Sequence, residues 1–118
     1  MIALSTVPNE ARCLWTQETH ILELSNCCPI SHNPQIGSKL SIIYEPQKLI
    51  LEVASLRTYI DSYRGGKDSI RSMEGMIQAI TQDAADVLQV YVRLEADLVI
   101  EPNQRISLKC AASPQRNQ

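Results

Sequence analysis

Residues 90–98 alternate apolar and polar side chains without a break. A strict period of two puts every second side chain on one face of an extended chain, so this segment is predicted to be a half-buried strand. Pro102 marks a turn, after which Ile106 and Leu108 alternate with polar neighbours as a returning strand. A pair of antiparallel strands is therefore expected to close the fold.

Three shorter apolar runs precede this pair, over residues 21–24, 39–44 and 49–53. They are rich in leucine and isoleucine and are bounded by turn-forming residues, which predicts three short strands. Pro46 separates the second run from the third. Because proline has no backbone N–H to donate, we expect it in a turn or at a bulge.

Two helices are predicted after the third run. Ser55 is expected to be the N-cap of the first helix, which Gly65 and Gly66 end. The second helix is expected to begin near Asp68 or Ser69 and to be the longest element. Apolar residues recur at helical spacing in both: Leu56, Tyr59, Ile60 and Tyr63 in the first, and Ile70, Met73, Ile77, Ile80, Ala84, Val87 and Leu88 in the second.

The predicted order is two strands, two helices and two strands, preceded by the run at 21–24. Strands that flank a helix pair favour an α+β fold, with an antiparallel sheet and both helices on one face. Residues 18–110 are expected to form a single domain. Residues 1–17, which show neither period, are expected to be an N-terminal arm, and residues 111–118 a C-terminal tail.

Composition restricts both the core and the location of the chain. With 4% aromatic residues and no Phe, the core is expected to consist of Leu, Ile, Val, Ala and Met. So modest a core is often completed by self-assembly, and we expect a homo-oligomer. A net charge of -2 argues against strong nonspecific binding to nucleic acid. Without an apolar run long enough to span a membrane or a leader-like start, a cytoplasmic location is predicted.

Residues capable of chemistry gather in the loop before residue 39. Cys28 lies four residues from His32, and a thiol beside an imidazole ionises readily, as nucleophilic catalysis requires. Inert packing of the cysteines, which are expected to be reduced, is the alternative. A zinc site is another, although the spacing matches no paired-ligand motif; its ligands would be His20, Cys27, Cys28 and His32.

A carboxylate interrupts the apolar part of the second predicted helix. Glu74 neighbours Ile70 and Ile77 at helical spacing, so its side chain is expected on or beside the buried face. A buried acid needs a partner. Glu74 either reaches water, or pairs with Arg71 or Lys67, or binds the N–H edge of a heterocycle.

Five segments carry a resemblance to a known family. They are Cys28-Pro29-Ile30-Ser31, Ile43-Tyr44-Glu45-Pro46, Glu52-Val53-Ala54-Ser55-Leu56-Arg57-Thr58-Tyr59, Asp61-Ser62-Tyr63-Arg64-Gly65 and Met73-Glu74. In this order, over roughly residues 20–103, they resemble the small tunnelling-fold (T-fold) enzymes called QueF. The resemblance implies a ββααββ unit whose copies close their sheets into a β-barrel and bind purine-like substrates between subunits.

The resemblance also implies a chemistry. One subgroup reduces the nitrile of 7-cyano-7-deazaguanine (preQ0) with NADPH on the way to queuosine; the archaeal QueF-like enzymes add ammonia to that nitrile on tRNA and make archaeosine. In both, a cysteine attacks the nitrile carbon to form a thioimide, and this cysteine corresponds to Cys28. Substrate contacts correspond to Glu74 and to the strand end Leu51, Glu52 and Val53.

One departure from the family concerns the cofactor. The reductases carry two lysines in the motif that contacts NADPH, and this chain has Ala54 and Arg57 at those positions. The reductases also carry an Arg-Gly-Gly sequence, which corresponds to Glu-Ala-Asp at residues 95–97 of this chain. Losing positive charge there argues against binding of a cofactor phosphate. Residues 61–65 are closer to the amidine-forming subgroup.

A second departure concerns proton transfer. The family aspartate that follows the cysteine corresponds to Gln35, and the histidine before the glutamate corresponds to Met73. A glutamine can hold the nitrile or a water by hydrogen bonds but does not carry protons. His32 is expected to substitute, since an imidazole exchanges protons near neutral pH.

The leading prediction is therefore a QueF-like enzyme that adds ammonia to the nitrile of preQ0, as the free base or in tRNA, without a cofactor or metal. Its alternatives are an NADPH-dependent nitrile reductase, a T-fold protein that binds 7-deazaguanine without turnover, and a zinc-dependent T-fold hydrolase. The predicted catalytic residues are Cys28, His32 and Gln35, and the predicted substrate-binding residues are Leu51, Glu52, Val53, Met73 and Glu74.

Overall fold

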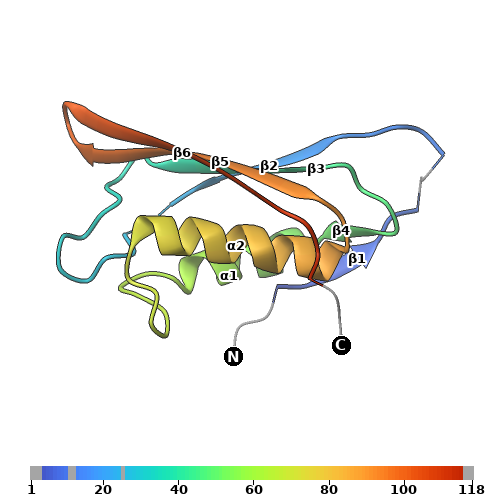
Figure 1. The fold of residues 1–118 in the computed structure, drawn as a ribbon, viewed down its shortest axis with the longest axis horizontal. Helices are drawn as coiled ribbons and strands as arrows, with labels where there is room; N and C mark the ends of the chain where they lie inside the picture. Colours follow the sequence, from blue (N-terminus) through green and yellow to red (C-terminus); the bar gives the residue numbers. More distant parts are fainter. Residues whose placement is uncertain (1–3, 11–12, 25, 116–118) are drawn as a thin grey trace.

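The computed structural model describes residues 4–10, 13–24 and 26–115 (Figure 1). No helix in these ranges is long and apolar enough to cross a membrane. The elements are β1 (Thr6–Pro8), β2 (Glu18–Glu23), β3 (Lys39–Tyr44), β4 (Leu49–Leu51), α1 (Val53–Asp61), α2 (Met73–Leu88), β5 (Val92–Glu101) and β6 (Gln104–Ala112).

The main sheet is antiparallel, with strand order β2-β3-β5-β6, and both helices lie on one of its faces (Figure 1). In β5, the side chains of Val92, Leu94, Ala96 and Leu98 are buried toward the helices. The predicted period of two is thus confirmed, although the strand begins two residues later because Val90 belongs to the turn after α2. The α+β fold with two helices on one face is also confirmed.

Strand β4 lies outside the main sheet. It pairs antiparallel with β1, with Thr6 opposite Leu51 and Pro8 opposite Leu49. The expectation that residues 49–53 form the second strand of the main sheet is wrong, since β2 and β3 supply its first pair. Tyr44 connects the two sheets, because its buried hydroxyl oxygen accepts the N–H of Leu51 at 3.0 Å.

Both terminal segments take part in the fold. The expected arm contributes β1 and the buried Leu4, and β6 extends to Ala112, inside the expected tail. Trp15 is 75% exposed, yet its indole N–H donates to Oε1 of Glu45 at 2.7 Å. Residues 1–3, 11–12 and 116–118 lie outside the described ranges.

Helix α1 begins at Val53 because Glu52, rather than Ser55, is its N-cap. The carboxylate of Glu52 accepts the N–H groups of Ala54 at 2.7 Å and Ser55 at 2.9 Å. These are N–H groups that the first turn of a helix cannot bond internally. The predicted cap at Ser55 is therefore wrong by one turn, and Val53 belongs to the helix rather than to a strand.

Helix α2 begins later than predicted. Its N-cap is Ser72, whose hydroxyl oxygen accepts the N–H of Gly75 at 3.0 Å. Residues 62–72 form an interhelix loop in which Lys67 and Ile70 exchange backbone hydrogen bonds of 3.0 and 2.8 Å. Ile70 packs against the core from this loop, so its place in the apolar pattern does not require a helix.

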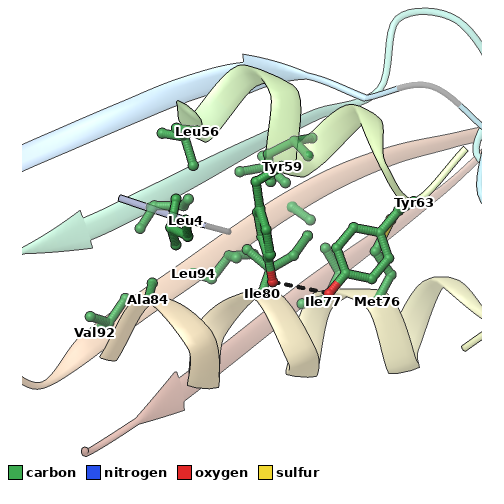
Figure 2. Packing of buried hydrophobic residues seen from close by; sticks show 14 of the residues in the cluster. Leu4, Leu56, Tyr59, Tyr63, Met76, Ile77, Ile80, Ala84, Val92 and Leu94 are labelled. Atoms are coloured by element: carbon green, nitrogen blue, oxygen red, sulfur yellow. Dashed lines mark hydrogen bonds between the residues drawn. The ribbon is translucent and has the colours of Figure 1, made fainter. Parts of the chain in front are cut away.

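The core lies between the helices and the main sheet (Figure 2). Aliphatic residues fill most of it, as expected, but Tyr44, Tyr59 and Tyr63 are each only 2% exposed. The hydroxyls of Tyr59 and Tyr63 share a 3.0 Å hydrogen bond, and Tyr59 also donates to Asp83. The ammonium of Lys67 lies 4.5 and 4.6 Å from the centroids of the same two rings. Tyrosine thus supplies the aromatic volume that the absence of Phe suggested was missing.

Candidate functional site

The loop between β2 and β3 is hydrogen-bonded to the sheet through one buried serine, Ser38. Ser38 is 0% exposed; its hydroxyl donates to the carbonyl of Gln35 at 2.7 Å and accepts the N–H of Val99 at 2.8 Å. The N–H of Gln35 donates to the carbonyl of Val99 at 2.7 Å, and the N–H of Leu24 to the carbonyl of Ser38 at 2.9 Å. The end of the loop at residues 35–38 is therefore fixed to β5, and the end at Leu24 is bonded to Ser38.

Within this loop, backbone hydrogen bonds close a tight turn around Cys28. The N–H groups of Cys27 and Cys28 donate to the carbonyl of Asn33 at 2.8 and 3.0 Å, and the N–H of His32 donates to the carbonyl of Cys28 at 2.9 Å. His32 has a φ of 59°, a left-handed conformation that turns the chain back. The turn is thus closed by hydrogen bonds of its own backbone.

The half-buried thiol of Cys28 is surrounded by donors from the residues that follow it. Its Sγ accepts the backbone N–H of Ser31 at 3.4 Å. The pKa of Cys28 is lowered from that of an ordinary thiol, chiefly by the hydroxyl of Ser31, then by the N–H groups of Ser31 and Ile30. Donors that favour the thiolate make this sulfur the better nucleophile of the two adjacent cysteines.

Cys27 has the opposite surroundings. It is 0% exposed, and its Sγ lies 3.9 Å from the carbonyl oxygen of Ser72 at the start of α2. Burial, followed by the neighbouring Cys28, raises the pKa of Cys27. A thiol that is buried and protonated does not react, so Cys27 serves packing between the loop and the helix.

His32 and Gln35, the other predicted catalytic residues, share this loop but differ in availability. The imidazole of His32 is exposed and has no hydrogen-bond partner among the described residues. The amide of Gln35 donates to the carbonyl of His32 at 3.1 Å and to Oδ1 of Asn33 at 3.0 Å. Because both contacts need a donor, a carboxylate could not make them, and Gln35 stabilises the turn instead of contacting Cys28.

Met73 and Glu74 lie in the first turn of α2, next to the same loop, because the preceding Ser72 touches Cys27. Glu74 is exposed. The expectation that it lies on or beside the buried face is wrong: the helix starts at Met73, and its buried positions begin at Met76 and Ile77. Its carboxylate is open to a ligand or to another chain.

Leu51, Glu52 and Val53 lie away from Cys28. They occupy the end of β4 and the start of α1. The loop that holds Cys28 lies near the other end of α1, so the length of this helix separates the two segments (Figure 1). The carboxylate of Glu52 is occupied by capping, whereas Val53 is 68% exposed. One copy of the chain therefore does not gather all the predicted site residues.

The zinc alternative receives no support from the geometry. His20 lies in β2, where its ring stacks on Tyr44 and its Nε2 is 2.7 Å from a carboxylate oxygen of Glu18. Cys27 points into the core. Among the described residues, no group of three or more histidine, cysteine, aspartate and glutamate side chains is placed to hold a metal ion.

Sequence reasoning missed the parts played by Ser31 and Ser38. The backbone N–H of Ser31 donates to Sγ of Cys28, and its hydroxyl is the main cause of the lowered pKa of that thiol, whereas Ser38 anchors the loop. The resemblance had included Ser31 only as part of a motif. A signal was available in its spacing, since a hydroxyl three residues after a cysteine can return to it across a turn.

The four strands of the main sheet and the two helices follow one another as β2-β3-α1-α2-β5-β6, a two-layered ββααββ unit to which β1 and β4 add a second, two-stranded sheet. Among solved structures, the chain is similar to an archaeosine synthase QueF-like in its apo form, with a TM-score of 0.66 and 16% sequence identity over 85% of this chain and 96% of that one. The sequence matches no protein-family model and no curated protein. At this identity, the similarity establishes the QueF-like T-fold.

Proposed function

We propose that this protein modifies 7-cyano-7-deazaguanine by adding ammonia to its nitrile, through a thioimide formed on Cys28. The observation that carries the proposal is an accessible thiol with a lowered pKa, held by donors in the Cys-Pro turn of a QueF-like fold. A reactive cysteine by itself would be compatible with many classes of electrophilic substrate. The fold, together with the residues that resemble QueF around it, favours this nitrile.

The proposed reaction needs no oxidant or reductant. The Cys28 thiolate attacks the nitrile carbon, a C–S bond forms, and the nitrogen accepts a proton to give the thioimide. Ammonia then adds to the same carbon, the C–S bond breaks, and the thiolate leaves behind an amidine. His32, exposed beside the turn, exchanges the protons in this scheme.

The rest of the substrate site comes, in this proposal, from a second copy in a cytoplasmic homo-oligomer. The separation of the start of α1 from the loop between β2 and β3 supports a shared site (Figure 1). Glu74 is exposed in the first turn of α2 beside the loop. Its carboxylate would accept the N–H edge of the base, with Met73, the exposed Val53 and the backbone from Leu51 to Glu52 lining the site.

Ammonia addition is favoured over reduction because the cationic group at the cofactor motif is already engaged. The guanidinium of Arg57 donates to Asp61 at 2.6 Å and to the carbonyl of Glu23 at 2.9 Å. Ala54 brings no charge. A cofactor phosphate would have to compete with these bonds, so NADPH binding is disfavoured.

A protein that captures the base without turnover is the second candidate. It is favoured by Gln35, which occupies the position of the family's proton-transferring aspartate. Both hydrogens of the Gln35 amide are used within the turn, so no acid is present at that position. Such a protein would form the thioimide as a stable adduct. Release of an amidine therefore separates the two candidates.

Intact-protein mass spectrometry tests the proposal. The full chain is incubated with 7-cyano-7-deazaguanine, with and without ammonium or NADPH, beside Cys28→Ala and, as a matched thiol control, the exposed Cys13→Ala. One substrate mass on wild type and Cys13→Ala, absent from Cys28→Ala and discharged as amidine by ammonium, is the expected result. Discharge only by NADPH would establish the reductase; no adduct at all would overturn the covalent mechanism.

A further inference from the structure

A pocket of about 310 Å³ lies at the end of the main sheet opposite the Cys28 loop (Figure 1). It is lined by the chain that leads into β2, the turn after β3 and the start of β5. Its floor is Ile43, which points away from the helices because its neighbours Ile42 and Tyr44 belong to the core, and which is nevertheless only 9% exposed. Ligand pockets have volumes of roughly 300–1,000 Å³, so this one is large enough for a small ligand.

Several polar side chains of the pocket are not used by the folded chain. Within the described ranges, the side chains of Gln17, Gln47 and Tyr91 make no hydrogen bond. In the same ranges, the only ion pair of the Arg93 guanidinium is a 3.8 Å contact with Glu95, in which both side chains are nearly half exposed. An exposed ion pair of this length contributes little. The donors and acceptors of these side chains are therefore available to a ligand.

Glu45 adds a carboxylate to the pocket, beside exposed aromatic side chains. It shares the pocket with Tyr91, which is 55% exposed. It also lines an adjoining depression with Trp15, whose indole N–H donates to its Oε1 at 2.7 Å. Among the residues that the structure describes, the other oxygen, Oε2, has no hydrogen-bond partner. A carboxylate only accepts hydrogen bonds, so it requires a ligand that donates.

These groups together fit a planar heterocycle better than an anion. The charges of Glu45 and Arg93 cancel, so the pocket has no excess positive charge for a phosphate. Tyrosine and tryptophan rings are surfaces on which nucleobases stack. Guanidinium and amide groups donate to the oxygens and ring nitrogens of a base, and a carboxylate accepts the hydrogens of an exocyclic amino group.

We propose that this pocket binds a nucleobase that carries an exocyclic amino group, separately from Cys28. The ring stacks on Tyr91, the amino group donates to Glu45, and Arg93 donates to an acceptor of the ring. A free nucleoside and an unpaired base in a single strand present the same groups. No covalent step is involved, and one copy of the chain supplies every group.

Trp15 is the single tryptophan of the chain and adjoins the pocket, so its fluorescence reports binding. The full chain is titrated with two pairs of nucleosides that differ at the amino position, cytidine with uridine and adenosine with inosine. Cytidine and adenosine are expected to bind about ten-fold more tightly than their carbonyl counterparts, since one well-placed hydrogen-bonded pair gives discrimination of this size. Equal dissociation constants within each pair, or no binding of any nucleoside, would overturn the proposal.

Two variants assign the roles of the side chains. Glu45→Gln retains an oxygen for Trp15 but adds amide donors, and it is expected to abolish the preference for cytidine over uridine. Tyr91→Ala is expected to weaken the binding of every nucleoside about ten-fold through lost stacking. Glu101→Gln, the same change at an exposed glutamate at the other end of β5, is the matched control and should bind as wild type. A preference for cytidine that survives in Glu45→Gln would overturn the proposal.

A cytidylate trimer, tested beside cytidine, distinguishes the two sources of the base. Tighter binding of the trimer identifies a single strand as the ligand, and equal affinity identifies a free nucleoside. Cys28→Ala is expected to bind cytidine as wild type does, because none of the described residues that line the pocket belongs to the Cys28 loop. Capture of 7-cyano-7-deazaguanine without nucleoside binding would leave the proposed function standing and overturn this inference, and the reverse result would do the opposite.

Discussion

The two ends of α1 contrast in how they use their polar groups. At the Cys28 end, the backbone and Ser38 hold the turn, and the thiol, the imidazole of His32 and the Glu74 carboxylate remain accessible. At the other end, the Glu52 carboxylate is used to cap the helix. The accessible thiol, imidazole and carboxylate therefore lie near one end of α1, whereas the other end presents the exposed apolar side chain of Val53.

The largest expected effect comes from mixing two variants. If Cys28 of one copy works with Val53 of another, Cys28→Ala and Val53→Arg are each inactive, but a mixture refolded together regains activity in about a quarter of its sites. Adduct formation with 7-cyano-7-deazaguanine is the assay. Val53 is 68% exposed, so arginine is tolerated there by the fold.

Each variant refolded alone serves as the control for the mixture. Activity that stays at zero in the mixture would show that a single copy holds the whole site, in spite of the separation along α1.

A second test compares the adjacent thiols as a function of pH. Because hydrogen bonds lower the pKa of Cys28 and burial raises that of Cys27, the thiolate of Cys28 persists to lower pH than that of an ordinary cysteine. Alkylation of the native protein at neutral pH is expected to be on the order of 100-fold faster at Cys28. Peptide mapping after timed iodoacetamide labelling measures both rates, and equal labelling before unfolding would contradict the burial of Cys27.

Ser38→Ala tests the region near the end of α1 that lies beside Cys28. It leaves the part-buried N–H of Val99 without the serine oxygen and the carbonyl of Gln35 without the hydroxyl, at a cost of about 2 kcal/mol in the free energy of unfolding. The pKa of Cys28 is expected to rise as the turn loosens. Urea unfolding followed by circular dichroism gives the first quantity, and the pH profile of alkylation gives the second.

Glu52→Ala addresses the opposite end and is expected to have the smallest effect. Removing the cap exposes the N–H groups of Ala54 and Ser55 and costs about 1 kcal/mol. Its alkylation profile should match that of wild type. A shift as large as that of Ser38→Ala would mean that the two ends of α1 are coupled through the helix.

Much of the fold can be predicted from the sequence because the strongest patterns, the alternation in strands and the helical spacing of apolar residues, are local. The alternation along β5 predicted its buried face, and helical spacing located most of α2. The errors lie where one local pattern competes with another. Ser55 has the chemistry of a cap, but the helix already begins at Val53, where the Glu52 carboxylate accepts the N–H groups of Ala54 and Ser55.

Long-range contacts account for the rest of what could not be predicted. The pairing of β1 with β4 joins three-residue segments more than forty positions apart, and such short strands show no usable period. In the site, Cys28 followed from a motif. That Gln35 donates both hydrogens inside the turn, and that Glu74 faces outward, depend on the folded turn and on where α2 starts.

The position of Trp15 has a practical consequence for spectroscopy. It is the single tryptophan of the chain, and it stands 75% exposed on a hydrogen bond to Glu45, away from the core. Its fluorescence is therefore expected to report release of the segment around residue 15 and to change little when the core melts. A Trp15→Phe, Tyr63→Trp chain would move the emission signal into the packed interior beside the Cys28 loop.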